Sequence, residues 1–385
     1  MPRARRPPRN RLPLAALVAL AAGACATAPP RPVPAPERAV PANEEPTALA
    51  PSPSAELFFP PEELEVSKLD LELAGKNDEE LFAIGTAAYE AKDFERAAAA
   101  FARIPDRFPG SRHEAAALFD AGLAYEELSE WRLAMERFRA LALGYDGPDA
   151  LEAAFKVAEC HYGLKDLPAT HAALLAIAAH PGLDPPSQVR VLTQLGVVEL
   201  EDGRPDDAER TLRRALATWQ AAGGAERIDP YYPAQAEYTL GETYREWFLA
   251  LAVDPSHGEE EKLEENLEHK SEMLLSAQGH YLRAIRMGDD RWAIASGIRV
   301  GELYDDFRRQ LLEAPLPPGL DEEAAQAYRA ELRARVRVLA TKAVNAYEAA
   351  LGRAARSGVD DLRFLGEAEE ALRRLQDALG EDRRI

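Results

Sequence analysis

The chain has 385 residues, of which 46% are apolar, so it is long enough to bury a large core. Its formal charge is −20, and five arginines lie in the first 24 residues, so the remainder carries 41 basic and 66 acidic side chains, a net charge of −25. A body this acidic repels nucleic-acid phosphates and anionic lipid surfaces, which argues against both as ligands of the folded part.

The N-terminus has the organisation of an export signal. Residues 1–11 are basic, and an apolar run of about a dozen residues from Leu12 ends in small residues before Cys25. Because that run is too short to span a bilayer as a helix, we predict that residues 1–24 are a secretory signal peptide.

The end of this signal carries a further motif. The stretch Ala22-Gly23-Ala24-Cys25 resembles the lipobox of bacterial lipoproteins, which implies cleavage before Cys25 and a covalent diacylglycerol and acyl lipid on that residue. No Asp follows Cys25, so the resemblance implies the outer membrane, with the protein on its periplasmic face. An ordinary signal peptide with a Cys near its cleavage point is the alternative.

The next segment is rich in proline. Residues 27–56 hold nine prolines and almost no large apolar side chains. Such a composition cannot bury enough surface to fold and favours extended polyproline II. We predict a disordered tether over residues 25–55, which could reach on the order of 90 Å at about 3.1 Å per residue.

Residues 56–76 separate this tether from the body of the chain. They include Phe58 and Phe59 beside two prolines, an unusual content for a solvated linker. We consider two interpretations of these phenylalanines: they close the first hairpin as an N-terminal cap, or they form a docking motif.

The body repeats one pattern, an apolar or small residue followed by Gly or Ala. It occurs at Ile84-Gly85, Ala121-Gly122, Val157-Ala158, Leu195-Gly196, Leu240-Gly241, Val300-Gly301 and Leu365-Gly366. The second residues of the first four pairs lie 37, 36 and 38 residues apart, and each is followed after 16 residues by a large apolar side chain such as Phe101 or Phe138. This period and content resemble the tetratricopeptide repeat, a pair of antiparallel helices.

The resemblance implies an all-α solenoid of stacked helical hairpins. We predict repeats over residues 77–222, two enlarged hairpins over 223–358, and a capping helix within 359–385, from about Val359 to Leu379. In the first enlarged hairpin Ala277, Tyr281 and Ala284 mark the returning helix. In the second, one buried stripe at helical spacing contains Leu332, Val336, Leu339, Ala343, Tyr347 and Ala350.

The chain lacks the common catalytic motifs. It has no P-loop, no nucleophile elbow and no H-E-x-x-H sequence. Glu265, His269 and Glu272 share one face of a predicted helix, but a solvated acidic face explains them better than a metal site. Cys160 lies within a repeat, where a buried thiol behaves as a small hydrophobe. We therefore predict no enzyme activity, no metal and no cofactor beyond the lipid.

The repeat resemblance also implies a binding surface. In tetratricopeptide arrays the first helix of each hairpin lines a concave groove that takes a peptide or a partner helix. The matching positions in this chain are Phe82, Tyr89, Phe119, Leu123, Glu127, Phe155, Glu159, Tyr162, Val197, Glu201, Tyr238, Glu242, Arg245, Glu302 and Asp305. Their aromatic and carboxylate groups suit a partner segment containing Arg, Lys and Pro. The alternatives are that the three phenylalanines are core and that the acids are ordinary solvated surface.

Lipobox and repeats together resemble tetratricopeptide lipoproteins that serve outer-membrane protein assembly, envelope coordination at division, pilus or secretion assembly, and gliding motility. That resemblance implies a non-catalytic scaffold that binds the proteins of an envelope complex and meets the membrane only through its lipid. The other classes considered are a cell-wall-active enzyme or accessory factor and a cytosolic adaptor.

Overall fold

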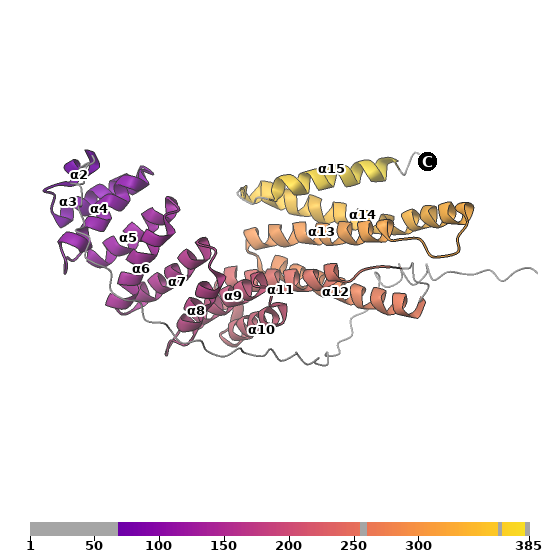
Figure 1. Cartoon of the computed structure of the whole chain (residues 1–385), viewed down its shortest axis with the longest axis horizontal. Coiled ribbons are helices and arrows are strands. Elements are labelled where there is room, and N and C mark those ends of the chain that lie inside the picture. Colours follow the sequence, from indigo (N-terminus) through magenta and orange to yellow (C-terminus); the bar gives the residue numbers. More distant parts are fainter. Residues whose placement is uncertain (1–67, 255–259, 361–363, 382–385) are drawn as a thin grey trace, which may run out of the picture.

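The computed structural model describes residues 68–254, 260–360 and 364–381, in which all the regular secondary structure is helical and no strand occurs (Figure 1). Cys25, Phe58 and Phe59 lie outside them. Helix α2 (Lys68–Leu73) precedes a series of antiparallel helix pairs. The pairs are α3 (Asp78–Glu90) with α4 (Phe94–Arg107), α5 (Glu114–Glu127) with α6 (Trp131–Gly144), α7 (Pro148–Gly163) with α8 (Leu167–Ala178), and α9 (Pro185–Glu201) with α10 (Pro205–Ala221).

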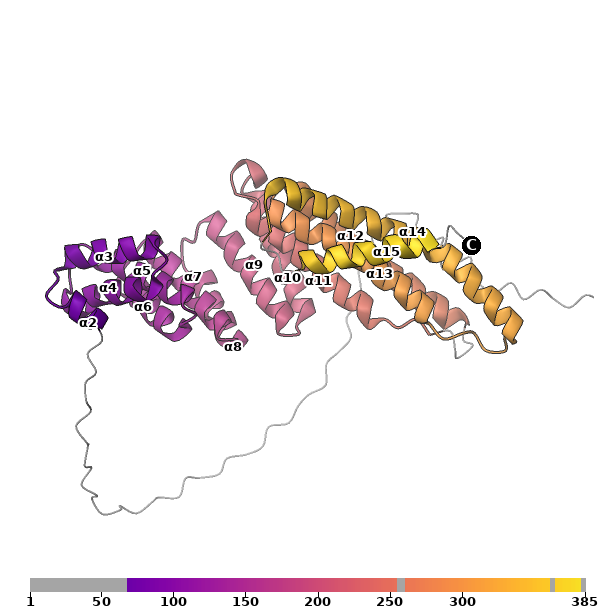
Figure 2. The ribbon, with the colours of Figure 1, turned by 90° about the horizontal axis from the view of Figure 1, so that it is seen from above.

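Two longer pairs follow, as the sequence predicts. After a short 3₁₀ turn at Gly224–Glu226 come α11 (Tyr231–Ala250) with α12 (Glu260–Met287), then α13 (Asp290–Glu313) with α14 (Glu322–Ser357). The last helix is α15 (Leu365–Glu381), which packs on α14. From α3 onward each helix contacts its neighbours in sequence, and α11 also contacts the first helices of the hairpins before and after it, α9 and α13. The array is thus a solenoid of successive hairpins (Figures 1 and 2), and the side formed by their first helices is called the inner side.

The small residue of each repeat allows its two helices to approach closely. A Cβ added at Gly85 would lie 2.6 Å from the ring of Phe101, and one added at Gly122 would lie 2.5 Å from the ring of Phe138. In the enlarged pairs Gly241 lies under Tyr281 and Gly301 under Tyr347 in the same way. The partner lies 16 residues after the glycine in the short hairpins, but 40 and 46 residues after it in the enlarged ones. Both insertions therefore lengthen the hairpin at the joint between its two helices.

The turns inside the four short hairpins share one geometry. The residue seven positions after each repeat glycine or alanine has a left-handed backbone, with φ of 60°, 59°, 62° and 72° at Lys92, Ser129, Lys165 and Gly203. At each turn two backbone N–H groups bond back to the end of the first helix, as from Lys92 to Tyr89 and from the next residue to Ala88. This Schellman arrangement satisfies carbonyls that the helix end would otherwise leave unpaired. Only the fourth turn uses the glycine that this conformation favours.

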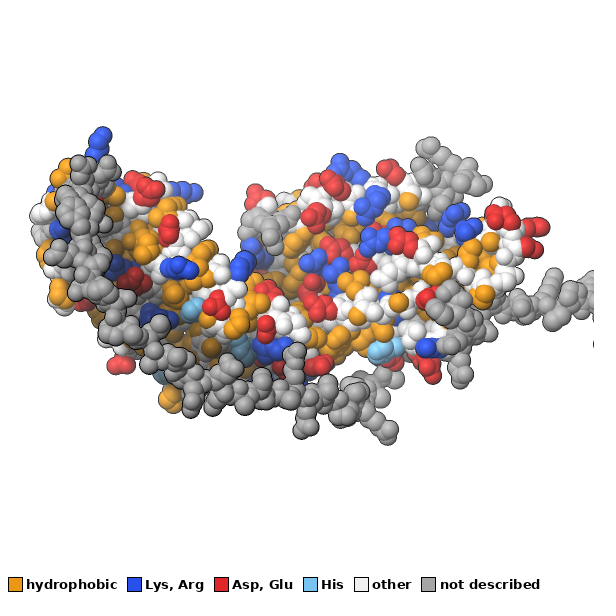
Figure 3. Space-filling model, in the orientation of Figure 1, with side chains coloured by type: hydrophobic (Ala, Val, Ile, Leu, Met, Phe, Trp, Pro, Cys, Tyr) orange, Lys and Arg blue, Asp and Glu red, His pale blue; other side chains and the backbone are white. Residues whose placement is uncertain are grey.

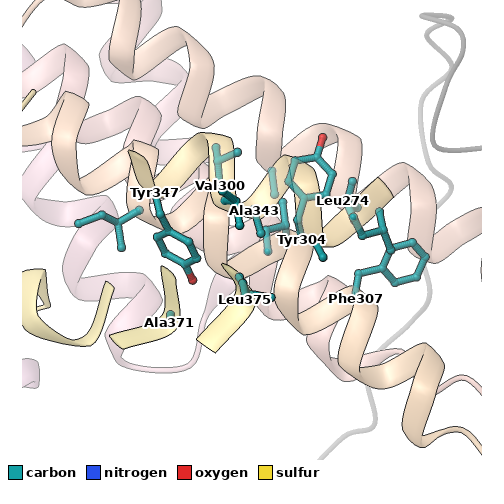
Figure 4. Close-up of a cluster of buried hydrophobic side chains, with 14 of the residues drawn as sticks. Leu274, Val300, Tyr304, Phe307, Ala343, Tyr347, Ala371 and Leu375 are labelled. Carbon is teal, nitrogen blue, oxygen red and sulfur yellow. The ribbon is translucent and has the colours of Figure 1, made fainter. Parts of the chain in front are cut away.

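The largest buried cluster lies in the C-terminal half. It combines side chains of α12, α13, α14 and α15, including Leu274, Tyr304, Phe307, Tyr347 and Leu375 (Figure 4). The predicted returning helix is α12, in which Ala277, Tyr281 and Ala284 are fully buried. All six residues of the predicted stripe on α14 are buried too. Spacing alone therefore located the core face of both long helices.

The last helix differs from its prediction. Gly358 adopts a left-handed conformation that ends α14, and α15 begins at Leu365 rather than near Val359. Leu365-Gly366, the seventh copy of the pattern, does not pack as the other copies do. Gly366 is exposed, and an added Cβ there would meet no neighbour within 4 Å. Leu375 and Ala371 instead fix α15 to the core. Among the described helices, none is both long and apolar enough to cross a membrane.

Candidate functional site

Several of the predicted inner aromatic side chains on the N-terminal hairpins are only partly exposed. Phe82 is half-buried, stacked on His113 with ring centroids 4.6 Å apart and edge-on to Phe101 at 5.5 Å. Phe119 makes the same edge contact with Phe138, and the half-buried Leu123 and Tyr89 pack against the same cores. The two edge contacts each join the helices of one hairpin, and Phe82, Phe119, Leu123 and Tyr89 all remain partly exposed.

The prediction that Phe155 and Asp305 are accessible on the inner side is wrong, because both side chains are buried. Phe155 is 1% exposed, because the guanidinium of Arg190 lies 3.9 Å above its ring and Leu174 and Val191 belong to the same buried cluster. Asp305 is 7% exposed, because Arg308 on its own helix and Arg374 on α15 both pair with its carboxylate. Neither residue is available to a partner in this structure.

Most of the predicted inner carboxylates are paired within the chain. Glu159 lies 2.8 Å from Lys156 and 3.1 Å from Arg190. Glu201 accepts a hydrogen bond of 2.7 Å from the hydroxyl of Tyr162. The inner face is therefore less negative than its acidic residues alone indicate.

On α11 and α13 this pairing forms a continuous network. Arg299 pairs with Glu242 at 3.1 Å and with Glu302 at 2.6 Å, and Arg245 pairs with Glu302 at 3.5 Å and with Asp306 at 3.0 Å. The hydroxyl of Tyr281 also donates to Glu242, and Arg299 donates to the hydroxyl of Tyr238. This half of the inner side stabilises the stacking of the enlarged hairpins, because each guanidinium joins neighbouring helices.

The sequence reasoning missed the basic members of these networks. Lys156 and Arg299 both lie two residues before the repeat's small residue, and Glu159 and Glu302 both lie one residue after it. The same i, i+3 pair thus recurs in two repeats, and this repetition is the signal that could have identified it. Arg190 lacks such a local partner, since it pairs with Glu152 at 2.5 Å across 38 residues.

A shallow pocket remains between α5 and α7. It is lined by Glu126, Glu127, Trp131, Lys156, Glu159, Tyr162 and Gly163. The indole of Trp131 covers Gly163, where an added Cβ would lie 2.6 Å from the ring. Tyr162 is 36% exposed, and Val197 on the adjacent α9 is half-buried. Figure 3 shows the surface hollowed between the N-terminal hairpins and the enlarged C-terminal ones.

The charges of this pocket do not balance. Lys156 is the one cation among the lining residues, bonded to Glu126 at 3.0 Å and to Glu159 at 2.8 Å, and Arg190 outside the lining also pairs with Glu159. The excess negative charge is therefore that of Glu127, which is exposed and forms no ion pair among the described residues. Burial raises the pKa of Glu126 despite Lys156, and burial also raises the pKa of Asp120 on the same helix. Since the carboxylate of Glu127 has no ion-pair partner among the described residues, an added cation would be favourable at this surface.

The other side chains that could take part in catalysis or metal binding have structural roles. The Cys160 thiol is fully buried, and burial followed by the nearby Glu126 charge raises its pKa to about 12, so it is a poor nucleophile. His280 and Glu237 form a buried pair 2.6 Å apart between α12 and α11, with Arg283 on the same carboxylate. Among the described side chains, no group of three or more His, Cys, Asp or Glu is placed to hold a metal ion, and Glu265, His269 and Glu272 do not form one.

Comparison with known proteins agrees with the repeat pattern. Residues 81–111 match the tetratricopeptide repeat family, and no curated protein matches the chain. Among solved structures, apo RapI is 12% identical with a TM-score of 0.46, and the alignment covers 80% of this chain and 99% of that one. A repeat protein from Bacteroides fragilis is 14% identical with a TM-score of 0.31, covering 60% of this chain and 98% of that one.

A third similar structure is MamA, which is 14% identical with a TM-score of 0.34, covering 52% of this chain and 97% of that one. The hairpin at α3 and α4 therefore contains the stretch that matches a tetratricopeptide repeat, and the described chain is an all-α solenoid of hairpins of that type.

Proposed function

We propose that this chain is a non-catalytic scaffold that binds a basic segment of a protein partner at the pocket between α5 and α7. The observation that carries the proposal is the unbalanced charge of this pocket beside two aromatic rings, Trp131 and Tyr162. An Arg or Lys of the partner would pair with Glu127 and lie against an aromatic face, where cation–π attraction adds to the charge attraction. A proline nearby in the partner would hold it extended at little entropic cost.

The proposed location follows from the N-terminus. A lipid on Cys25 would hold the chain at the periplasmic face of the outer membrane, and residues 25–55 would set its reach. In that setting the scaffold would serve a protein assembly, secretion or motility machine of the envelope. The lipobox resemblance and the pocket support this proposal independently of each other.

A peptide probe tests the pocket. We expect a fluorescein-labelled peptide of alternating Arg and Pro to bind the full chain, and we expect Glu127→Gln with Tyr162→Ala to weaken binding about tenfold, since each change removes a contact of about 0.5–1 kcal/mol. Glu136→Gln on the outer side of α6 is the matched control, because Glu136 is exposed and lies outside the pocket. Equal binding by the pocket variant and the control would refute the pocket.

Crosslinking in cells tests the function itself. A photoreactive residue at position 162 should capture a protein with Arg- or Lys-rich segments, and the same residue at the exposed position 175 on α8 should not. Capture of the same proteins from both positions would contradict a specific site. Turnover of purified peptidoglycan by the chain would instead favour the cell-wall enzyme.

Fractionation tests the location separately. The wild-type chain should float with outer membranes and incorporate labelled lipid, whereas Cys25→Ser should lose both. If both forms stay soluble with residues 1–24 intact, the envelope location is wrong and a cytosolic adaptor remains, whatever the pocket binds.

A further inference from the structure

We propose that residues 56–67, which immediately precede α2, dock on the outer side of α6, with Phe58 and Phe59 in a pocket on that side. This outer pocket is separate from the pocket between α5 and α7, so the docking does not depend on the function proposed above. The segment itself lies outside the described residues. The support comes from the outer pocket, from the composition of the segment and from the place where α2 begins.

The outer pocket lies on the side of α6 that is turned away from α5. The opposite side of the helix carries Phe138, which packs on Gly122 of α5. The pocket has a volume of about 310 Å³. Its lining consists of Arg132, Met135, Glu136, Arg139, Ala140 and Leu143. Leu143 is 82% exposed, the highest value among the exposed large hydrophobic side chains of the described residues, and Leu133 on the same helix is 41% exposed. Clustered apolar groups that face water in this way are typical of a surface that another segment covers.

Two arginines flank this apolar lining. Arg132 and Arg139 are seven residues apart, about two helical turns, so they project from the same side of α6. Both are exposed, and neither they nor Glu136 form an ion pair within the described part of the chain. Two arginines and one glutamate give the lining a net charge of +1, on a chain whose formal charge is −20. The outer pocket therefore suits an occupant that is both apolar and acidic.

The segment before α2 has this chemistry. Residues 56–67 contain four glutamates and no Lys or Arg, together with Phe58 and Phe59. A phenylalanine ring contacts a methionine sulfur favourably, and an arginine guanidinium is attracted to its face, so the rings suit Met135 and Arg139. The two prolines that follow Phe59 keep the chain extended at little entropic cost.

The position of α2 on α4 brings this segment toward the C-terminal end of α4. Asp70 of α2 pairs with Arg103, whereas Glu72, further along α2, pairs with Arg96. Helix α2 therefore runs antiparallel to α4 and begins beside its C-terminal end. Figures 1 and 2 show α2, α4 and α6 in succession along the N-terminal part of the solenoid.

The same end of α4 lies against α6, within reach of the segment. Asp106 pairs with Arg137 at 2.8 Å, and Arg137 directly follows Glu136 of the outer pocket. The nine residues from Phe59 to Lys68 span up to about 30 Å when extended, against about 20–24 Å for the widths of two helices. A covalently attached segment also has an effective concentration on the order of millimolar. It would therefore occupy the outer pocket in preference to a free partner of the same chemistry.

Docking on α6 would set the direction in which the tether leaves the solenoid. With residues 56–67 held on α6, only the stretch before them would act as a tether, and it would leave from the outer side. A lipid on Cys25 would then hold the inner side away from the membrane, where a partner can reach it. This consequence rests on the lipid proposed above, whereas the docking does not.

Disulfide trapping in the full chain tests the docking. Leu57→Cys with Ala140→Cys, in a chain that also carries Cys25→Ser, should form an intramolecular disulfide under mild oxidation, detected by mass spectrometry of the linked peptides. The remaining thiol, Cys160, is fully buried. Leu57→Cys with Glu127→Cys is the matched control, because Glu127 is exposed on the inner side of the same hairpin. Its disulfide should form at least tenfold more slowly.

Two further changes in the trapped chain identify the contacts. Phe58→Ala with Phe59→Ala should slow the disulfide about tenfold, because the two rings supply most of the apolar contact and lie outside the described core. Arg139→Glu should slow it about threefold, since it repels the glutamates of the segment. Arg214→Glu, which reverses an exposed arginine of α10, should have no effect.

Four outcomes would overturn the docking. They are equal rates at positions 127 and 140, no disulfide from either pair, no effect of the two phenylalanine changes, and a disulfide that forms only between two chains. The last outcome would assign the outer pocket to a second copy instead.

Discussion

Gly122 occupies a position at which a single methyl group decides stability. A Cβ there would lie 2.5 Å from the ring of Phe138, which is itself fully buried between α5 and α6. We expect Gly122→Ala to destabilise the chain by about 1–3 kcal/mol, because the ring cannot move without disturbing the rest of the core. Gly144→Ala at the end of α6 is the control, since no atom lies within 4 Å of its added Cβ and alanine favours the helix. Urea unfolding of both variants measures the difference, and equal midpoints would contradict the close approach.

Lys270 makes stability depend on pH. Its ammonium group is fully buried and donates to the carbonyls of Phe248 and Leu251 at the end of α11. Burial lowers the pKa of Lys270 from 10.5 to about 8, so between these values the unfolded chain binds more protons than the folded one. The free energy of unfolding should therefore rise with pH from about 8 to 10.5, by up to about 3 kcal/mol from this group.

A comparison of two chains isolates this effect. The difference in unfolding free energy between wild type and Lys270→Met should grow in favour of wild type between pH 7.5 and pH 9.5, whereas tyrosine ionisation acts on both chains alike. A difference that stays constant across this range would show that Lys270 has an ordinary pKa in the folded chain.

At the scale of an element, the turns of the short hairpins carry local strain. Lys92, Ser129 and Lys165 hold a left-handed backbone that costs a residue with a Cβ about 1–2 kcal/mol. We expect replacement of each by Gly to stabilise the chain by about 0.5–1 kcal/mol, the remainder being offset by the greater freedom of glycine when unfolded. Gly203→Ala at the equivalent fourth turn should destabilise by a similar amount. Thermal unfolding of the four variants checks the signs, and a loss of stability in Lys92→Gly would exclude this account.

At the scale of the whole molecule, a solenoid transmits a local defect only to neighbouring units. Leu375 on α15 is fully buried in the C-terminal cluster, and Leu375→Ala should cost about 2–5 kcal/mol there. Hydrogen exchange should then quicken in α13, α14 and α15 while α3 and α4 keep their protection. Glu370→Ala, which alters an exposed side chain of α15, is the control. Uniform loss of protection along the chain would mean that the array unfolds as one cooperative unit.

The amino-acid sequence by itself determined the hairpins, the position of the long insertions and the buried faces of α12 and α14. These features depend on contacts inside one hairpin, such as Gly85 with Phe101, which recur at nearly constant separation and therefore leave a readable period. Cys25, Phe58 and Phe59 lie outside the described residues, so the lipid on Cys25 and the cap or docking role of the two phenylalanines stay predictions.

Only the tertiary structure decided which inner side chains are exposed and which charges are neutralised. Phe155 is buried because Arg190 from the next hairpin covers it, and Asp305 is buried because Arg374 reaches it from 69 residues away. Such pairs depend on how far each hairpin rotates relative to the last, a quantity that residue spacing within a helix does not contain. The excess negative charge beside Lys156 likewise depends on the tertiary structure. It is seen only when the other predicted inner acids are paired with their partners in space, which leaves Glu127 without one among the described residues.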